Sequence, residues 1–277
     1  MDFGANIASA GTTQAAGIGG LRVVSWNLLR RVGADVEDVA RLIRRERPDL
    51  FLFQEATDEI NALPSLVGGH FFRHPMQKRI YGLAVWSPHP LRSPQILSLP
   101  VSALPGRVPP RVAQIVQLHG ITIANVHLSH GQFLNRRQLL RVAGALHGPA
   151  AIIGDFNSVG PVILPGFEDV GPRRRTHKAS NIVSLRLDRC MTRSMRCASA
   201  KVLEKGSSDH HPIVLDLAIA TETETKLRKK RFRLSNSARR STDLKFAAVP
   251  SKSGETSGWT QVKTGQKLQV FSRLFQV

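Results

Sequence analysis

The sequence predicts an α/β or α+β fold, and three observations lead to that prediction. Short apolar runs of strand length alternate along the chain with segments whose apolar residues recur at helical spacing. Several of the short runs end at a polar side chain, as strands do where they meet a loop. The chain has 277 residues, of which 42% are hydrophobic, and its mean hydropathy is −0.13. Such a composition is typical of a globular protein with one large domain or two small ones.

The first predicted strand and helix lie near the start of this pattern. Leu21 to Trp26 forms a largely apolar run that ends at Asn27. Asp35 is a good N-cap, because a carboxylate accepts hydrogen bonds from the free N–H groups of a first helical turn. The helix that follows has apolar residues on one face and ends before Pro48.

Later strands are predicted from apolar runs of the same length. They cover Leu50 to Phe53, Leu83 to Trp86, Val112 to Leu118, Ile121 to Val126, Ala151 to Ile153 and Leu185 to Cys190, and a last strand follows the polar turn that begins at Ser207. A second helix is predicted to begin at Asn135, which forms a capping-box pattern with Gln138, and to end near Gly148.

Five predicted strands meet their loops at side chains that chemistry can use. These side chains are Asn27, Glu55, His127, Asp155 with Asn157, and Asp209 with His210. Ligands collect where strand ends meet loops, so residues far apart in sequence can converge there. Each residue alone is equally well explained as a turn former, but five together favour a functional site.

Positive charge is in large excess. Lys and Arg number 39 against 20 Asp and Glu, which gives a formal net charge of +19. No carboxylate occurs between Glu59 and Asp155, a stretch that contains nine Lys or Arg residues. Such a field attracts nucleic acid, anionic lipid or phosphate esters, although a merely solvated basic surface also explains it.

Several protein classes are excluded by what the sequence lacks. Cys190 and Cys197 are too few for a disulfide framework, have no zinc-ligand spacing, and are expected to pack as small hydrophobic residues. No apolar stretch reaches the roughly 20 residues of a membrane span. The first twenty residues lack the basic and apolar regions of a secretory signal, so we expect a cytoplasmic protein.

The candidate side chains suit a metal-dependent reaction on a phosphate ester. Carboxylate and amide oxygens select Mg²⁺, or alternatively Mn²⁺, over softer metals. Glu55 is the first candidate ligand. Asp155 would deprotonate or orient a water molecule, and the Asn157 amide would position that carboxylate or a phosphate oxygen.

The candidate histidines suit contacts with a phosphoryl group. His127 and His210 can donate hydrogen bonds to a phosphoryl oxygen as negative charge builds on it. A carboxylate behind a histidine fixes its tautomer and raises its pKa. Asp188 is the only acid between Arg173 and Arg196, and we predict that it is the partner of His210.

Six short motifs follow one another along the chain. They are Trp26-Asn27, Gln54-Glu55, Asn125 to Ser129, Gly154-Asp155-Phe156-Asn157, Leu187-Asp188-Arg189 and Ser208 to Pro212. Together they resemble the endonuclease/exonuclease/phosphatase superfamily of metal-dependent phosphohydrolases, which includes pancreatic deoxyribonuclease, AP endonucleases and sphingomyelinases. The resemblance covers about residues 21–219. It implies a four-layer α/β sandwich, with two β-sheets face to face and helices outside.

The resemblance also implies domain limits and residue roles. It places a catalytic domain at residues 21–220. Segment 1–20 is expected to be flexible, and the composition of residues 221–277, rich in Ser, Thr, Lys and Gly, predicts a basic tail that is disordered or an adventitious helix. The implied roles are Mg²⁺ ligand for Glu55 with Asn27 and Asp209 near the metal, and catalytic contacts for His127, Asp155, Asn157, Asp188 and His210. Asp155 would activate the attacking water or protonate the leaving group.

The substrate is open to three hypotheses. Arg111 and Arg174 are candidate anchors for a substrate phosphate, although ordinary exposed arginines explain both. The basic charge favours a phosphodiesterase acting on nucleic acid, and the short loops favour a phosphoesterase of anionic lipid or of a small phosphorylated metabolite. A non-catalytic basic module that binds nucleic acid or membrane is the third hypothesis. We expect a monomer with no obligate protein partner.

Overall fold

The computed structural model describes residues 20–102, 108–179 and 183–224. The predicted segment 1–20 and the tail 221–277 therefore lie almost wholly outside the described residues. The strands are β1 (Leu21–Asn27), β2 (Leu50–Ala56), β3 (His70–Pro75), β4 (Gly82–Ser87), β5 (Gln95–Ser98), β6 (Val112–Leu118), β7 (Ile121–His127), β8 (Ala150–Asp155), β9 (Glu168–Asp169), β10 (His177–Ala179), β11 (Val183–Leu185), β12 (Asp188–Arg193), β13 (Met195–Val202) and β14 (Ile213–Ile219). The helices are α1 (Val36–Glu46), α2 (Leu63–Val67) and α3 (Gln132–Ala145), with 3₁₀ turns η1 (Arg30–Val32) and η2 (Asp58–Ala62).

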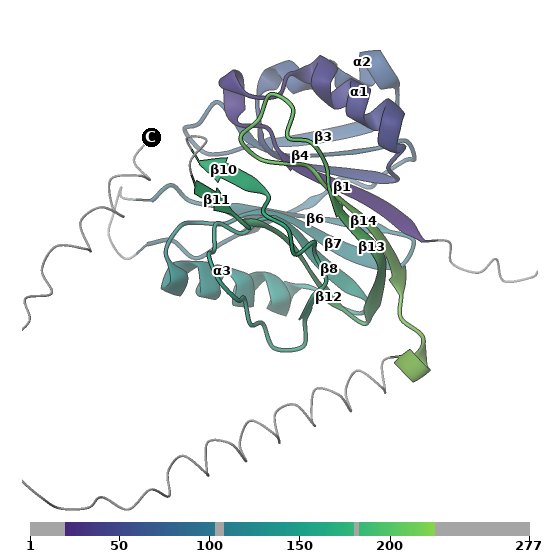
Figure 1. Cartoon of the computed structure of the whole chain (residues 1–277), viewed down its shortest axis with the longest axis vertical. Coiled ribbons are helices and arrows are strands. Elements are labelled where there is room, and N and C mark those ends of the chain that lie inside the picture. Colours follow the sequence, from purple (N-terminus) through teal and green to yellow (C-terminus); the bar gives the residue numbers. More distant parts are fainter. Residues whose placement is uncertain (1–19, 103–107, 180–182, 225–277) are drawn as a thin grey trace, which may run out of the picture. The chain divides into compact units, whose positions relative to one another are not determined.

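Two six-stranded sheets face each other (Figure 1). The strand order is β13-β14-β1-β2-β4-β3 in the first sheet and β5-β6-β7-β8-β12-β9 in the second, and β10 and β11 form a separate hairpin. Both sheets have one parallel pair near their centre, β1 with β2 and β7 with β8, while their other pairs are antiparallel. The two parallel pairs therefore occupy equivalent places in the two sheets.

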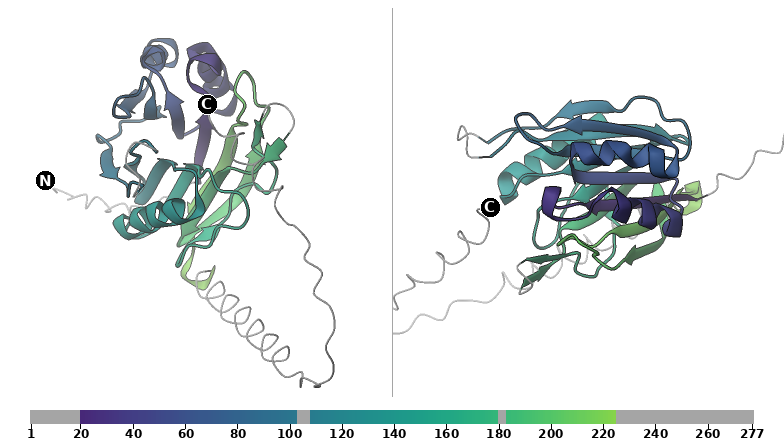
Figure 2. Two further views of the ribbon diagram at one scale, coloured as in Figure 1. Left: turned by 90° about the vertical axis from the view of Figure 1, so that its left-hand side faces the viewer. Right: turned by 90° about the horizontal axis from the view of Figure 1, so that it is seen from above.

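Successive side chains of each strand point to opposite faces of the sheet, so each sheet packs against the other sheet on one face and against helices on the other. Leu52 of β2 packs with Ile123 of β7 in the core between the sheets. The next residue, Phe53, points to the opposite face, where it packs with α1 and α2, because successive strand residues face opposite sides. On the second sheet, Ile152 packs with Val142 of α3. Figure 2 shows these helices on the outer faces, so the predicted four-layer sandwich is confirmed.

The first helix begins as the sequence predicts. The Asp35 carboxylate accepts from the backbone N–H of Asp38 over 2.8 Å, and the Asp38 carboxylate accepts from the backbone N–H of Asp35. The two residues thus form a capping box. After Glu46 the chain turns at Arg47, whose φ is 47°, one residue before Pro48.

The predicted start of the second helix is wrong. Helix α3 begins three residues earlier, at Gln132, with Gly131 as its N-cap. Asn135 and Gln138 lie inside the helix and are buried, and their amides bond outward instead of capping it. Asn135 Nδ2 donates to the backbone oxygens of Ser129 and Phe156. The pair therefore fixes the loops that lead away from β7 and β8.

The predicted strand Leu185 to Cys190 is also wrong as one element. Strand β11 ends at Leu185 and β12 begins at Asp188, because Thr176 Oγ1 accepts the backbone N–H groups of Leu187 and Asp188 and interrupts the run there. Cys190 is buried in the core between the sheets, as expected of a small hydrophobic residue. In the described part of the chain, no helix has the length and apolar character to cross a membrane.

Candidate active site

The predicted strand ends meet at one edge of the sandwich. Asn27 ends β1, and its Nδ2 donates to Oδ2 of Asp155, the last residue of β8, over 3.1 Å. His127 ends β7 and lies between two carboxylates. Its Nε2 is 3.6 Å from Asp155 Oδ2 and 4.0 Å from Oε1 of Glu55 on β2. The ends of both parallel pairs therefore contribute to one cluster, which we call the active-site cluster.

A buried amide pair holds the two sheets in register beneath this cluster. Gln54 Nε2 donates to Asn125 Oδ1 over 2.8 Å, and Asn125 Nδ2 donates to the backbone oxygens of Phe53 and Ala84, each over 3.0 Å. The pairing of β2 with β4 shifts register between Phe53 and Ala56. Within that shift Glu55 has a φ of 55°. A bulge of this kind re-aims a side chain, and here it carries Glu55.

Asp155 is the centre of the cluster and is ionised. Its Oδ1 accepts from the backbone N–H of Asn157 over 2.8 Å, and Asn157 has a φ of 47°, a conformation that asparagine tolerates better than most residues. Burial raises the pKa of Asp155, but the charge of His210 and the hydrogen bonds from the Asn157 N–H and the Asn27 amide outweigh burial and lower it below its ordinary value.

His210 forms a buried ion pair with Asp188. The Nδ1 of His210 lies 2.9 Å from Asp188 Oδ2, and its Nε2 lies 3.8 Å from Asp155 Oδ2. Burial alone would lower the pKa of His210, but the carboxylates of Asp188 and Asp155 outweigh burial and raise it to about 10. The imidazole is therefore a cation at neutral pH. Trp26 Nε1 donates to the His210 backbone oxygen over 2.9 Å, so Trp26 supports the loop from within the core.

The groups around Glu55 have opposing effects on its pKa. Burial and the nearby Asp155 raise the pKa of Glu55, while Arg30 and Arg111 oppose that rise. Arg30 Nε donates to Glu55 Oε2 over 2.9 Å, and its guanidinium lies 5.0 Å from the centre of the Tyr81 ring. The Arg30 side chain is more than a third exposed, so Glu55 connects the buried cluster to the surface.

Arg111 is buried with unsatisfied donors. Its Nε and Nη1 have no hydrogen-bond partner in the described structure, and the residue is only 6% exposed. Burial lowers the pKa of Arg111, whereas Tyr81, Asp155 and Glu55 oppose that change. Burial and the Arg111 charge also lower the pKa of His127 well below 6.5, so His127 is neutral. Buried donors without partners require an explanation, and an anion at the site supplies one.

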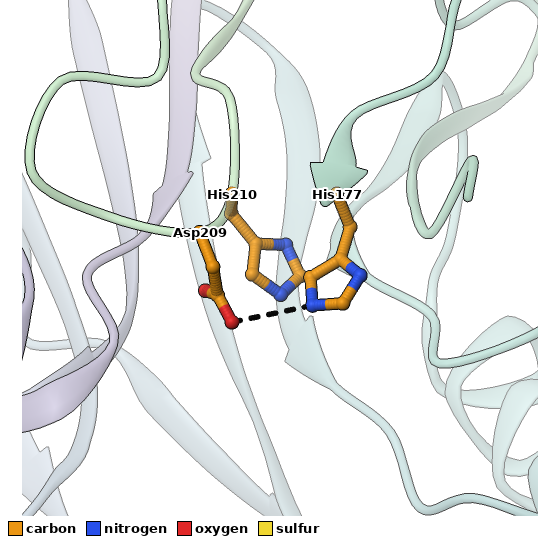
Figure 3. Close-up of side chains that lie close together, drawn as sticks. All are labelled: His177, Asp209 and His210. Atoms are coloured by element: carbon orange, nitrogen blue, oxygen red, sulfur yellow. Dashed lines mark hydrogen bonds and ion pairs between the residues drawn. The ribbon is translucent and has the colours of Figure 1, made fainter. Parts of the chain in front are cut away.

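Asp209 lies beside a histidine that the sequence analysis did not select. His177 Nε2 is 3.3 Å from Asp209 Oδ2, and the rings of His177 and His210 are 4.4 Å apart (Figure 3). One ligand atom from each of these three residues lies within 4.8 Å of the others. His177 begins β10, in a segment whose sequence predicts only a basic loop. A lone histidine in such a loop has no periodic signal by which it could be identified.

Two groups of side chains could hold a metal. Glu55 and Asn27 offer hard oxygen ligands near Asp155, and a cation there would oppose the rise that burial gives the pKa of Glu55. These residues fit Mg²⁺ or Mn²⁺. His177, Asp209 and His210 offer a mixed nitrogen and oxygen set of the kind that suits a transition metal, but His210 is a cation paired with Asp188 and would have to lose its proton before it bound one. Asp209 contacts His177 and not the Glu55 group, so its predicted role near the same metal stays a prediction.

The second predicted phosphate anchor stands apart. Arg174 is exposed, and no hydrogen bond or ion pair within the described ranges joins it to the cluster. Its predicted role therefore stays a prediction as well. Conversely, Arg30 was not selected from the sequence although it contacts Glu55. Arg30 lies in a turn in which it and Leu29 both have positive φ values, and because both residue types avoid that conformation, the sequence does not reveal the turn.

The sequence motifs and this geometry agree with a family match. The model of the Endonuclease/Exonuclease/phosphatase family matches residues 24–210. The chain belongs to this family. Its members are hydrolases that act on phosphoesters and generally use a divalent metal. The match runs from β1 to His210 and so includes the whole active-site cluster. No curated protein sequence gives a significant match.

Solved structures share the fold at low sequence identity. An endonuclease/exonuclease/phosphatase from Bacteroides vulgatus aligns with a TM-score of 0.61 at 15% identity, over 72% of this chain and 99% of that one. A humanized TDP2 from D. rerio gives 0.59 at 17%, over 72% and 99%. A mannosyl-6-phosphatase from Bacteroides thetaiotaomicron gives 0.57 at 16%, over 72% and 100%. Proteins with these different titles share the sandwich, so the fold alone does not select a substrate.

Proposed function

We propose that the chain is a divalent-metal-dependent phosphoester hydrolase that uses the active-site cluster. The supporting observation is the placement of Asp155, an ionised carboxylate that lies between a neutral His127 and a cationic His210. A carboxylate can orient a water molecule for attack, and an imidazolium can stabilise a phosphoryl oxygen as its charge grows. The two kinds of group stand within 4 Å of each other.

Each residue has a distinct part in the proposed reaction. Asp155 accepts a hydrogen bond, and then the proton, from the attacking water, and the N–H of Asn157 keeps its carboxylate oriented. As the water oxygen bonds to phosphorus, the ester P–O bond breaks and the leaving group departs with its electron pair as an alkoxide or phenolate that solvent water protonates. His210 donates from Nε2 to a phosphoryl oxygen, while Asp188 holds the proton on Nδ1 and thereby preserves the charge. His127 donates to the same phosphate as a neutral imidazole.

Arg111 anchors the substrate in this proposal. Its unpartnered N–H groups match the oxygens of a phosphate, and a guanidinium can bind two of them at once. The metal would be held by Glu55 with Asn27, and Asp209 is a further candidate ligand. When bound, a divalent cation neutralises phosphate charge and lowers the pKa of a water molecule. The large positive charge of the chain favours a polyanionic phosphodiester, either nucleic acid or anionic lipid.

Hydrolysis of bis(p-nitrophenyl) phosphate tests the proposal, since this diester needs no contact outside the cluster. The wild-type chain is assayed with Mg²⁺, with Mn²⁺ and with EDTA, beside Glu55→Gln and Asp155→Asn. Glu59→Gln is the matched control, because Glu59 is an exposed carboxylate on η2, close in sequence to Glu55. We expect metal-dependent turnover that falls about 10²–10⁴-fold in the two site variants.

Circular dichroism and thermal melting show whether each variant is folded, so a loss of turnover can be distinguished from a loss of structure. Variants that melt like the wild type but lose turnover support the assignment. Equal turnover in folded Asp155→Asn would remove Asp155 from the reaction. Arg111→Ala is expected to raise KM for the diester, and an unchanged KM would remove Arg111 from substrate binding.

A further inference from the structure

The exposed apolar side chains concentrate at the edge that carries the active-site cluster. The described residues include seven large exposed hydrophobic side chains. Five of them lie where connections leave or enter that edge: Val32 between β1 and α1, Ile80 between β3 and β4, Val101 between β5 and β6, Phe133 in the first turn of α3, and Val159 between β8 and β9. Of the other two, Ile163 lies further along the connection from β8, which runs on to β9 near the opposite edge, and Leu140 lies on α3.

The opposite edge differs within the described residues. Its connections are residues 47–49, 68–69, 88–94, 119–120, 146–149 and 194, and none of them carries an exposed large hydrophobic side chain. Phe133 is 90% exposed and Val32 is 79% exposed, so these two side chains do not pack against the hydrophobic core. Exposed apolar side chains grouped around a site, which we call apolar tips, indicate a surface that binds a protein, a membrane or a ligand.

The same edge carries cations beside the apolar tips. Lys78 and Arg79 directly precede Ile80 and are exposed, and so are Arg136 and Arg137, one helical turn after Phe133. The segments that carry Ile80, Val101 and Phe133 all lie within the stretch that contains no carboxylate. The acids at this edge belong to other segments, such as Asp58 and Glu59 on η2. Interspersed cations match the negative surface potential of an anionic bilayer.

The side-chain chemistry favours lipid over nucleic acid. Proteins hold single-stranded nucleic acid largely by stacking bases on aromatic rings, and Phe133 is the only aromatic residue among these five exposed side chains. The other four are valine or isoleucine, which neither stack on bases nor form side-chain hydrogen bonds. Burying aliphatic side chains at the boundary between headgroups and acyl chains gives a favourable free energy of binding.

We propose that this edge docks on an anionic phospholipid bilayer, with the apolar tips in the acyl boundary and the adjacent cations on headgroup phosphates. Docking in this way would bring a headgroup phosphodiester to Arg111 and Asp155. That catalytic consequence rests on the proposed function, whereas the docking itself does not. The substrate class would then be a phosphodiester or phosphate ester of a lipid headgroup.

Cosedimentation of the full chain with vesicles tests the docking. The vesicles contain phosphatidylcholine alone or phosphatidylcholine mixed with phosphatidylglycerol. The double variant Phe133→Ser with Ile80→Ser removes two tips, and Leu140→Ser is the matched control because Leu140 is exposed but lies away from the edge. We expect the wild type and Leu140→Ser to bind the anionic vesicles, and the double variant to bind at least roughly tenfold more weakly. The wild type and both variants carry the same basic tail, so the tail contributes equally to vesicle binding in all three proteins.

Two outcomes overturn the docking proposal. One is equal binding by all three proteins, which would assign binding to charge alone. The other is that the wild type does not bind the anionic vesicles; if the double variant then also loses affinity for a single-stranded oligonucleotide, this edge is a nucleic-acid surface. Turnover of bis(p-nitrophenyl) phosphate is measured on the same samples and is expected to be equal in all. Turnover without vesicle binding refutes the docking alone, and vesicle binding without turnover refutes the proposed function alone.

Discussion

Replacing Asp188 by asparagine should neutralise His210 at the pH where the enzyme works. Asp188 is the first carboxylate that holds the pKa of His210 at about 10 instead of the ordinary 6.5. That difference corresponds to roughly 5 kcal/mol in favour of the protonated imidazole. In Asp188→Asn burial dominates and draws the pKa of His210 back toward or below its ordinary value. At a pH of about 8 we therefore expect turnover to fall about 10²–10³-fold, because a cation that faces the phosphate is lost.

The pH dependence of the melting temperature provides a second test of the Asp188→Asn prediction. A histidine with a raised pKa stabilises the fold fully below 6.5, and the stabilisation disappears as the pH rises through about 10. The melting temperature of the wild type should therefore exceed that of Asp188→Asn most clearly just below pH 6.5, and the difference should narrow as the pH rises toward about 10. Imidazole nitrogen NMR follows the His210 ring directly, with His210→Gln used to assign its signals. A His210 ring that stays protonated above about pH 9 in Asp188→Asn would refute the reasoning.

Two further predictions concern the supports of the site. Asp169→Asn should lower stability by about 3 kcal/mol at neutral pH, because it leaves the buried Arg189 without its carboxylate partner. Its partners lower the pKa of Asp169, so the loss in melting temperature should shrink as the pH falls below 3.8. Gly154→Ala should prevent folding or cost over about 4 kcal/mol, since a Cβ there would lie 2.1 Å from the Val126 oxygen at a φ of 139°. Gly144→Ala, where a Cβ meets nothing within 4 Å, should melt at or above the wild-type temperature.

The central strands could be predicted because their local sequence and their burial agree. Leu21 to Asn27, Val112 to Leu118 and Ile121 to His127 lie in apolar runs, and each is a strand with nearly the predicted bounds. The edge strand His70–Pro75 is exposed at both ends and only partly buried between them, and it contains three polar residues, so its sequence carries no apolar run to identify. Pairing with β4 makes it a strand, and pairing partners are a property of the fold.

The site was predicted in part for a related reason. Residues at strand ends, such as Asp155 and His127, could be found because a strand fixes where its last residue lies. Arg30 and His177 lie outside the central strands, and only the folded chain brings them to Glu55 and Asp209. The capping-box pattern at Asn135 was misleading because a buried amide served the loops around it better than the helix start. Polar residues have several possible partners, and sequence alone does not rank them.

The two sheets contribute to the cluster by the same local device. In each sheet a central parallel strand ends in a side chain that crosses toward the other sheet, Asn27 from the first and His127 from the second. In the strand paired with each of these, or just beyond its end, a residue has positive φ: Glu55 at the bulge within β2, and Asn157 two residues after β8. Such conformations cost of order 1–3 kcal/mol each. Packing between the sheets must supply that energy, so the distances within the cluster depend on the core between the sheets as much as on the loops above it.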